Sequence, residues 1–334
     1  MKGFGRRSST MVRHLLGGPD DPRSAALRRF GLSISVLTVV GHTVLGFEQA
    51  YLTPVVAVAA ALITEGVLGS IDAYGRRVHP WYSRSASAVV DFLLPAYITA
   101  LACAMLLYAN DRLMPTVLAT VAGVASKYVV RVRVAGRARH VLNPSNTGIV
   151  LVLLLFPWVG IAPPYQFTEW ISGPLDALIP LAVLMAGTML NAKLTRKAPL
   201  IAGWAAGFVA QAVIRWAMTD ISLVSALLPM TGTAFILFTN YMITDPGTTP
   251  APPRHQVVFG AATAAVYGVL VHFHIVFGLF FALVIACALR ACVLVAAERI
   301  PRPREERASV PAQSSHGAAE PAAAPASSLQ PESR

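Results

Sequence analysis

The chain has 334 residues, of which 55% are hydrophobic and only 13% are charged, and its formal net charge at pH 7 is +11. This charged share is about half that of a usual soluble domain, and residues 145–163 and 275–298 are apolar all round, which excludes an ordinary water-soluble fold. The basic residues form short clusters between apolar segments rather than one continuous face, so no nucleic-acid partner is expected.

The apolar segments predict an all-α, polytopic transmembrane helical bundle with about ten spans in a lipid bilayer. The predicted spans are residues 30–47, 51–71, 87–109, 113–130, 145–162, 174–191, 199–217, 222–243, 256–273 and 275–297. A basic segment, residues 1–28, precedes this membrane domain of residues 29–299, and no cleavable signal is expected. Residues 300–334 are rich in Pro, Ala, Ser and Glu and are predicted to be disordered. An arrangement in two pseudo-repeated halves is left open.

The distribution of Lys and Arg predicts the orientation, because cytoplasmic loops carry the excess of these residues. Basic clusters such as Arg131 to Arg139 and Lys193 to Lys197 alternate with loops that hold little positive charge, such as the one around Glu48. Both termini are therefore predicted to be cytoplasmic, in a multi-pass protein of the plasma membrane.

Two loops on the predicted cytoplasmic side carry polar residues that a connector does not need. The first, His140 to Gly148, contains Asn143, a good N-cap, and Pro144, which suits the first helical position, so backbone N–H groups and the positive end of a helix dipole face outward. The second, Thr239 to Pro250, ends a helix at Pro246. Each loop taken singly is also explained by capping and turn chemistry. Together they predict a polar site built from helix ends on one face of the bundle.

At these motifs the sequence resembles the D subunit of the Rnf electron-transport complex and the B subunit of the sodium-translocating NADH:quinone reductase. The similar segments are Asn143-Pro144 with Gly148, and Thr244-Asp245-Pro246 followed by Thr248-Thr249-Pro250. An actinobacterial branch associated with enediyne antibiotic biosynthesis, the UnbU-like membrane proteins, is more similar still, and shares segments like Ser126-Lys127-Tyr128 and residues 163–168.

The resemblance implies a flavin, riboflavin or FMN, held without a covalent bond between the two loops, and a role in electron transfer. The candidate ligands that it implies are His140, Asn143, Asn146, Asp245, Thr248 and Thr249. The relatives attach a further FMN to a Ser/Thr-Gly-Ala-Thr stretch that residues 160–173 lack, so covalent flavin is not expected. No Gly-rich dinucleotide fingerprint follows a strand, so the chain is expected to be at most a redox subunit that depends on a partner protein or a quinone.

Ionisable residues within spans are costly and need partners. Glu65 is deep and has no partner nearby in the sequence, which makes it the candidate for an intramembrane proton or cation contact, although a protonated, hydrogen-bonded Glu explains it equally well. Asp72 and Arg76 are expected to form an ordinary helix-end pair. The three cysteines lack metal-ligand spacing and are interpreted as buried thiols, so no metal site is predicted. The Gly203-Trp-Ala-Ala-Gly207 pattern predicts close helix packing.

The sequence thus favours an electron-transfer protein that binds flavin without a covalent bond and serves a specialised biosynthetic pathway. Two alternatives are left open. The first is an ion or small-molecule transporter that keeps the fold without flavin, with a path past Glu65. The second is a membrane scaffold for biosynthetic enzymes.

Overall fold

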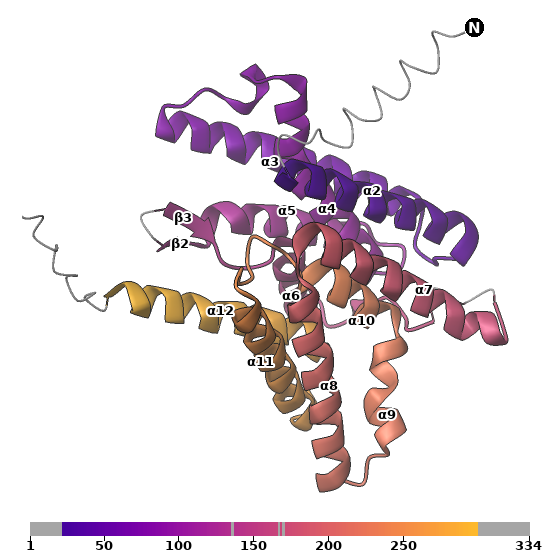
Figure 1. The fold of residues 1–334 in the computed structure, drawn as a ribbon. Helices are drawn as coiled ribbons and strands as arrows, with labels where there is room; N and C mark the ends of the chain where they lie inside the picture. Colours follow the sequence, from indigo (N-terminus) through magenta and orange to yellow (C-terminus); the bar gives the residue numbers. More distant parts are fainter. Residues whose placement is uncertain (1–21, 135–136, 166–167, 169–170, 300–334) are drawn as a thin grey trace, which may run out of the picture. The chain divides into compact units, whose positions relative to one another are not determined.

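The computed structural model describes residues 22–134, 137–165, 168 and 171–299. Its long helices follow one another along the chain, joined by short connections (Figure 1). They are α2 (Pro22–Val40), α3 (Leu52–Arg76), α4 (Ala86–Leu106), α5 (Met114–Val129), α6 (Pro144–Leu155), α7 (Pro174–Leu190), α8 (Ala198–Met218), α11 (Pro253–His272) and α12 (Gly278–Arg299). Shorter helical segments are η1 (Gly41–Leu45), η2 (Trp81–Ser83), η3 (Asn191–Thr195), α9 (Leu223–Leu227), η4 (Leu228–Thr231), α10 (Thr233–Leu237) and η5 (Phe238–Met242).

Strands in the described part of the chain form two small antiparallel sheets. In the first, β1 (Leu107–Tyr108) pairs with β4 (Gly160–Ile161). In the second, β2 (Arg131–Val134) pairs with β3 (Arg137–His140) in a hairpin that sets Arg131 opposite His140. The fold is therefore helical, as the sequence predicts, and the hairpin positions the first polar loop.

Six helices of the described residues are long and apolar enough to cross a membrane, namely α3, α4, α7, α8, α11 and α12, and a bent pair of helices brings the number to seven if it forms one span. These helices confirm the prediction of a multi-pass membrane protein. Of the predicted domains, the basic segment of residues 1–28 is described only from residue 22 onward, and the tail of residues 300–334 lies outside the described residues.

Four predicted spans differ from straight transmembrane helices. The first, residues 30–47, falls on α2 and η1, which are not among the six long apolar helices. Helix α5 has 16 residues and α6 has 12, and at 1.5 Å per residue α6 is about 18 Å long, short of the roughly 30 Å hydrocarbon core. The predicted span of residues 222–243 is broken at Gly232, where Leu223–Thr231 and Thr233–Met242 are bent by 61°. The apolar composition of these segments predicts that they avoid water, but it does not predict where a helix ends or bends. The count of ten spans and the orientation stay predictions.

Small residues bring two helix pairs into backbone contact. A Cβ added to Gly148 of α6 would lie 1.9 Å from the carbonyl oxygen of Ala119 in α5. In the other pair a Cβ on Gly203 of α8 would lie 2.5 Å from the carbonyl oxygen of Val257 in α11. The close packing that the GxxxG pattern predicts at Gly203 is therefore confirmed, and α11 is the helix that fills it.

Candidate functional site

The two polar loops, about a hundred residues apart in sequence, meet at Asn143. The Asn143 Oδ1 accepts from the Asn146 backbone N at 2.9 Å and from the Ser145 Oγ at 2.9 Å, while its Nδ2 donates to the Met242 carbonyl oxygen at 3.1 Å. Asn143 is thus the N-cap of α6, as the sequence predicts, and its amide also holds α6 to the C-terminal end of η5. Its side-chain oxygen and nitrogen both bond within the chain, so Asn143 holds the two loops together.

Asp245 organises the second loop. Its Oδ1 accepts from the Gly247 backbone N at 3.1 Å and its Oδ2 from the Thr248 Oγ1 at 2.9 Å, while the Thr249 Oγ1 donates to the Asp245 carbonyl oxygen. Both threonines are buried and Asp245 is half-buried. The threonine hydroxyls therefore stabilise the turn, and the Asp245 carboxylate is more accessible than they are.

His140, the last residue of β3, packs against the second loop. A Cβ on Gly247 would lie 2.7 Å from the His140 Nε2, so only a glycine leaves room for the ring there. Burial lowers the pKa of His140, and the positive charges of Lys127 and Arg131 act in the same direction, whereas the charge of Asp245 opposes them. The ring is consequently neutral at pH 7 and can both donate and accept a hydrogen bond.

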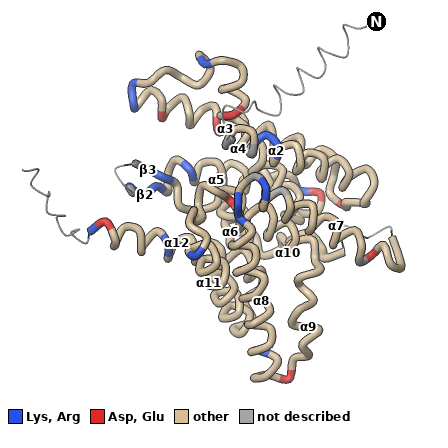
Figure 2. The backbone as a smooth tube through the Cα atoms, in the orientation of Figure 1, with Lys and Arg blue, Asp and Glu red and all other residues tan. Residues whose placement is uncertain are grey.

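Two cations that the sequence did not single out as site residues complete the cluster. The Lys197 Nζ donates to the Pro250 carbonyl oxygen at 2.8 Å, and the Arg290 guanidinium donates to the Thr248 carbonyl oxygen at 2.7 Å. Burial lowers the pKa of Lys197 to about 8; the charge of Asp245 opposes this shift and that of Arg290 adds to it. An arginine within the 22-residue apolar helix α12 is the sequence signal that could have revealed Arg290. Lys and Arg also mark β2 and β3 in Figure 2.

Asn146 lies beside these loops in the first turn of α6. Its Nδ2 donates to the Phe280 carbonyl oxygen at 2.9 Å, but its Oδ1 is buried and has no hydrogen-bond partner among the described residues. The Gln256 Oε1 in the first turn of α11 is likewise buried and has no hydrogen-bond partner among the described residues. A buried amide oxygen without a donor costs free energy, so these atoms point to places where a ligand or water donor is accommodated.

The structure gives Glu65 a partner that its own helix lacks. The Lys127 Nζ of α5 lies 2.6 Å from the Glu65 Oε2, and the Tyr128 hydroxyl donates to the Glu65 Oε1 at 3.0 Å. The Glu65 side chain is 5% exposed and that of Lys127 is 12% exposed. Glu65 has no partner nearby in the sequence, and the packing of α3 against α5 brings in one that lies 62 positions away in the chain.

The other predicted polar residues find structural roles. Asp72 pairs with Arg76 at 3.0 Å, as expected, and also with Arg131 at 3.0 Å.

Two of the three cysteines are buried, but Cys292 is exposed, which corrects its interpretation as a buried thiol. No group of three or more His, Cys, Asp or Glu side chains arranged to hold a metal ion occurs among residues 22–299 as far as the structure describes them.

Comparison with known proteins adds no assignment. No protein-family model matches the sequence, and no curated protein matches it. The family resemblance at the two loops therefore stays a prediction. What the structure contributes is the geometry: a half-buried carboxylate, a neutral imidazole and two cations gathered where the loops meet. Such a set can bind a polar ring and stabilise negative charge on it.

Proposed function

We propose that the protein binds riboflavin or FMN without a covalent bond where the two loops meet, and that it takes part in electron transfer. A redox partner protein or a membrane quinone would supply or take the electrons. The observation that carries this proposal is the hydrogen bond from Asn143 to the Met242 carbonyl oxygen, which joins the His140 and Asp245 loops into one cluster. Enediyne-type natural-product biosynthesis is the pathway that the resemblance suggests.

The residues present fit a flavin in their chemistry. The Asp245 carboxylate can accept from a ring N–H, and the neutral imidazole of His140 can donate to a ring carbonyl. A bound flavin supplies reversible acceptance of electrons. Lys197 and Arg290 place positive charge on the backbone of the Asp245 loop, which favours negative charge nearby. Asn146, whose Oδ1 lacks a donor among the described residues, offers a further acceptor.

The remaining predicted ligands act through the loops themselves. Asn143 fixes the spacing of the two loops, and Thr248 and Thr249 bind the Asp245 turn. Each is a positioning residue in this proposal, because its side chain is buried and bonded within the chain. The half-buried Asp245 carboxylate also has partners in its turn, but its oxygens can accept from a further donor.

We also propose an orientation with both termini cytoplasmic in the plasma membrane, with α5, α6 and the bent pair lying within the bilayer beside the long helices. The alternation of basic clusters along the chain supports this orientation. Reporter fusions after Arg139 and after Pro163 test it: alkaline phosphatase should be inactive at the first position and active at the second. The reverse pattern would overturn the orientation.

An absorption spectrum tests the flavin proposal directly. The protein purified in mild detergent should show flavin bands, and acid precipitation should release the flavin into solution. A His140→Ala, Asp245→Ala double variant should lose the bands while keeping its elution volume and helical circular dichroism. Asp176→Ala, which removes an exposed carboxylate in the first turn of α7, is the matched control and should keep them. A folded but colourless wild-type protein, after expression in flavin-replete cells, would overturn the proposal.

Transport past Glu65 is the weaker alternative. The Lys127 ammonium already neutralises this carboxylate, and the Tyr128 hydroxyl occupies one of its oxygens. These contacts favour a structural role for Glu65. No contact among the described residues points to a surface for the scaffold alternative.

A further inference from the structure

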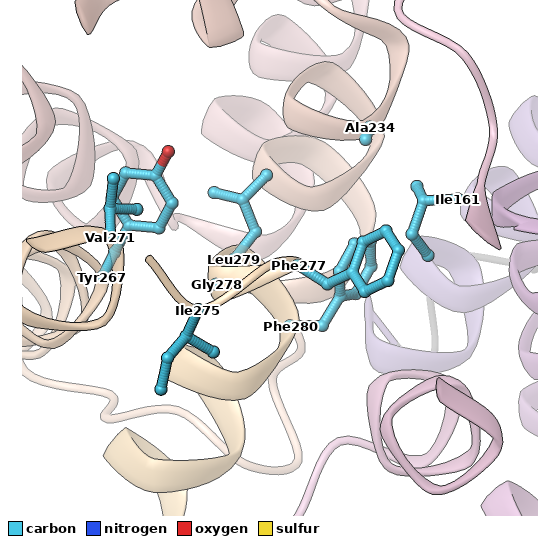
Figure 3. A pocket seen from close by; sticks show the side chains of 9 residues that line it. All are labelled: Ile161, Ala234, Tyr267, Val271, Ile275, Phe277, Gly278, Leu279 and Phe280. Carbon is cyan, nitrogen blue, oxygen red and sulfur yellow. The ribbon is translucent and has the colours of Figure 1, made fainter. Parts of the chain in front are cut away.

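A second site lies between the α11–α12 turn and the bend of the α9–α10 pair. A cavity of about 270 Å³ is lined there by Ile161 of β4, Ala234 of α10, Tyr267 and Val271 of α11, and side chains of the α11–α12 turn. Figure 3 shows these side chains around the space, and the Tyr267 hydroxyl is the polar atom among them. The volume lies just below the roughly 300–1,000 Å³ typical of ligand sites. The lining suits an apolar chain.

Helix α8 packs against α11, two of whose residues line this cavity. Helices α8 and α11 are parallel and side by side, because contacts advance together along both: Gly203 meets Val257, and Gln211 meets Gly268 (Figure 1). Trp204, Phe208, Gln211 and Arg215 recur at helical spacing on one face of α8. The Phe208 ring stacks on Tyr267, and the Trp204 ring meets Tyr267 edge-on. One turn beyond Gln211, Arg215 is thus level with Val271 and His272 at the end of α11.

The Gln211 and Arg215 side chains on this face have no hydrogen-bond or ion-pair partner among the described residues. Gln211 is 7% exposed, and neither its Nε2 nor its Oε1 has a hydrogen bond. Arg215 is half-buried in the last turn of α8, within electrostatic range of Tyr267, and no carboxylate of the described residues lies within 4.0 Å of it. Buried amides and cations are costly in an apolar setting unless they are paired. These residues, which we name the far-end cluster (Gln211, Arg215 and Tyr267), are arranged for an anionic group from outside the chain.

We propose that this site binds an anionic phospholipid, with one acyl chain in the cavity and the phosphate at Arg215. The charge of Arg215, with which no carboxylate of the described residues pairs, favours an anionic headgroup. The turn next to the cavity exposes large apolar side chains, Phe273 at 70% and Val276 at 67%, so its surface is open to a bilayer that can supply the chain. The site is separate from the loops assigned to flavin and does not depend on that proposal.

Native mass spectrometry of the full-length protein tests this inference, with phosphatidylglycerol and phosphatidylcholine of identical acyl chains as probes. The wild type should retain phosphatidylglycerol in preference to phosphatidylcholine. Arg215→Gln should reduce that preference about fivefold to tenfold, because it removes the charge, whereas Arg215→Lys should keep most of it. Arg112→Gln is the matched control: Arg112 lies over the Trp158 ring in another predicted far-side loop, and the preference should not change.

Filling the cavity tests the position of the chain separately from the charge. Ala234→Leu, which adds side-chain volume to the cavity wall, should reduce retention of both lipids without altering the melting temperature by more than a few degrees. Equal retention of the two lipids by the wild type would overturn the proposal. So would an unchanged preference in a folded Arg215→Gln variant, unchanged retention in Ala234→Leu, or retention of a free fatty acid in place of the phospholipid.

Discussion

Two groups of polar residues inside this protein differ in whether their side chains are hydrogen-bonded within the chain. In the loop cluster (His140, Asn143, Asp245, Lys197 and Arg290), the side chains of Asn143, Lys197 and Arg290 donate to backbone carbonyl oxygens of distant segments and hold the loops together. In the far-end cluster, by contrast, the Gln211 amide has no partner among the described residues. Bonded polar groups hold a structure, whereas unpartnered ones cost stability and mark places where something outside the chain binds. Mutations at the two kinds of residue should therefore differ in sign.

The largest effect is expected at the Glu65–Lys127 ion pair, another bonded pair. Glu65→Leu leaves the Lys127 ammonium buried without its counter-charge and should lower the free energy of unfolding by about 3–5 kcal/mol. Titration with a denaturing detergent, followed by circular dichroism, measures this loss. Arg76→Gln, at the more exposed Asp72–Arg76 pair, is the control and should cost less than about 1 kcal/mol.

The double variant sharpens this test. Glu65→Leu combined with Lys127→Leu removes both charges and should recover part of the stability that the single variant loses. If the single substitution costs no more than Arg76→Gln, the ion pair is not the structural contact that its burial indicates.

A smaller loss is expected at Asn143. Asn143→Ala removes the N-cap of α6 and the bond to the Met242 carbonyl oxygen, and should cost about 2 kcal/mol. Ser222→Ala removes an exposed cap, that of α9, and should cost about 0.5–1 kcal/mol. Equal losses in the two variants would mean that the contact between the loops adds nothing beyond the cap.

The opposite sign is expected at Gln211. In detergent without anionic lipid, Gln211→Leu replaces a buried amide that lacks partners and should raise the free energy of unfolding by about 1 kcal/mol. Gln49→Leu is the matched control and should be destabilising, because the Gln49 Nε2 donates to the Met105 and Leu107 carbonyl oxygens. Destabilisation of both variants to the same extent would remove the distinction between bonded and unpartnered groups.

The smallest effect is a change of slope with pH at Lys197. Its pKa in the folded protein is about 8, below the usual 10.5, so between these values the unfolded chain binds a proton that the folded chain has released. Stability therefore rises with pH across this window, and the unfavourable contribution of the charged Lys197 is fully present only below about pH 8. Lys197→Gln should flatten the rise of melting temperature between pH 8 and pH 10, whereas Lys193→Gln, at an exposed position, should leave it unchanged.

The sequence predicted contacts within a helical turn better than contacts between distant segments. The cap at Asn143 and the pair of Asp72 with Arg76 were predicted correctly, because both depend on residues within one helical turn. The GxxxG pattern predicted that Gly203 packs closely on a helix, but not that α11 is its partner. The sequence does not predict the break at Gly232, since an apolar composition fits a straight span and a bent one equally well.

The sequence by itself determined that this is a helical membrane protein, because the solvent a helix requires follows from the composition of its own surface. It also placed two polar loops at helix ends. Only the tertiary structure decided which residues these loops and helices meet: Lys127 for Glu65, Met242 for Asn143, and none among the described residues for the Gln211 amide. Such pairings depend on which helices pack together, and the pattern of apolar residues along a single helix does not specify its neighbour.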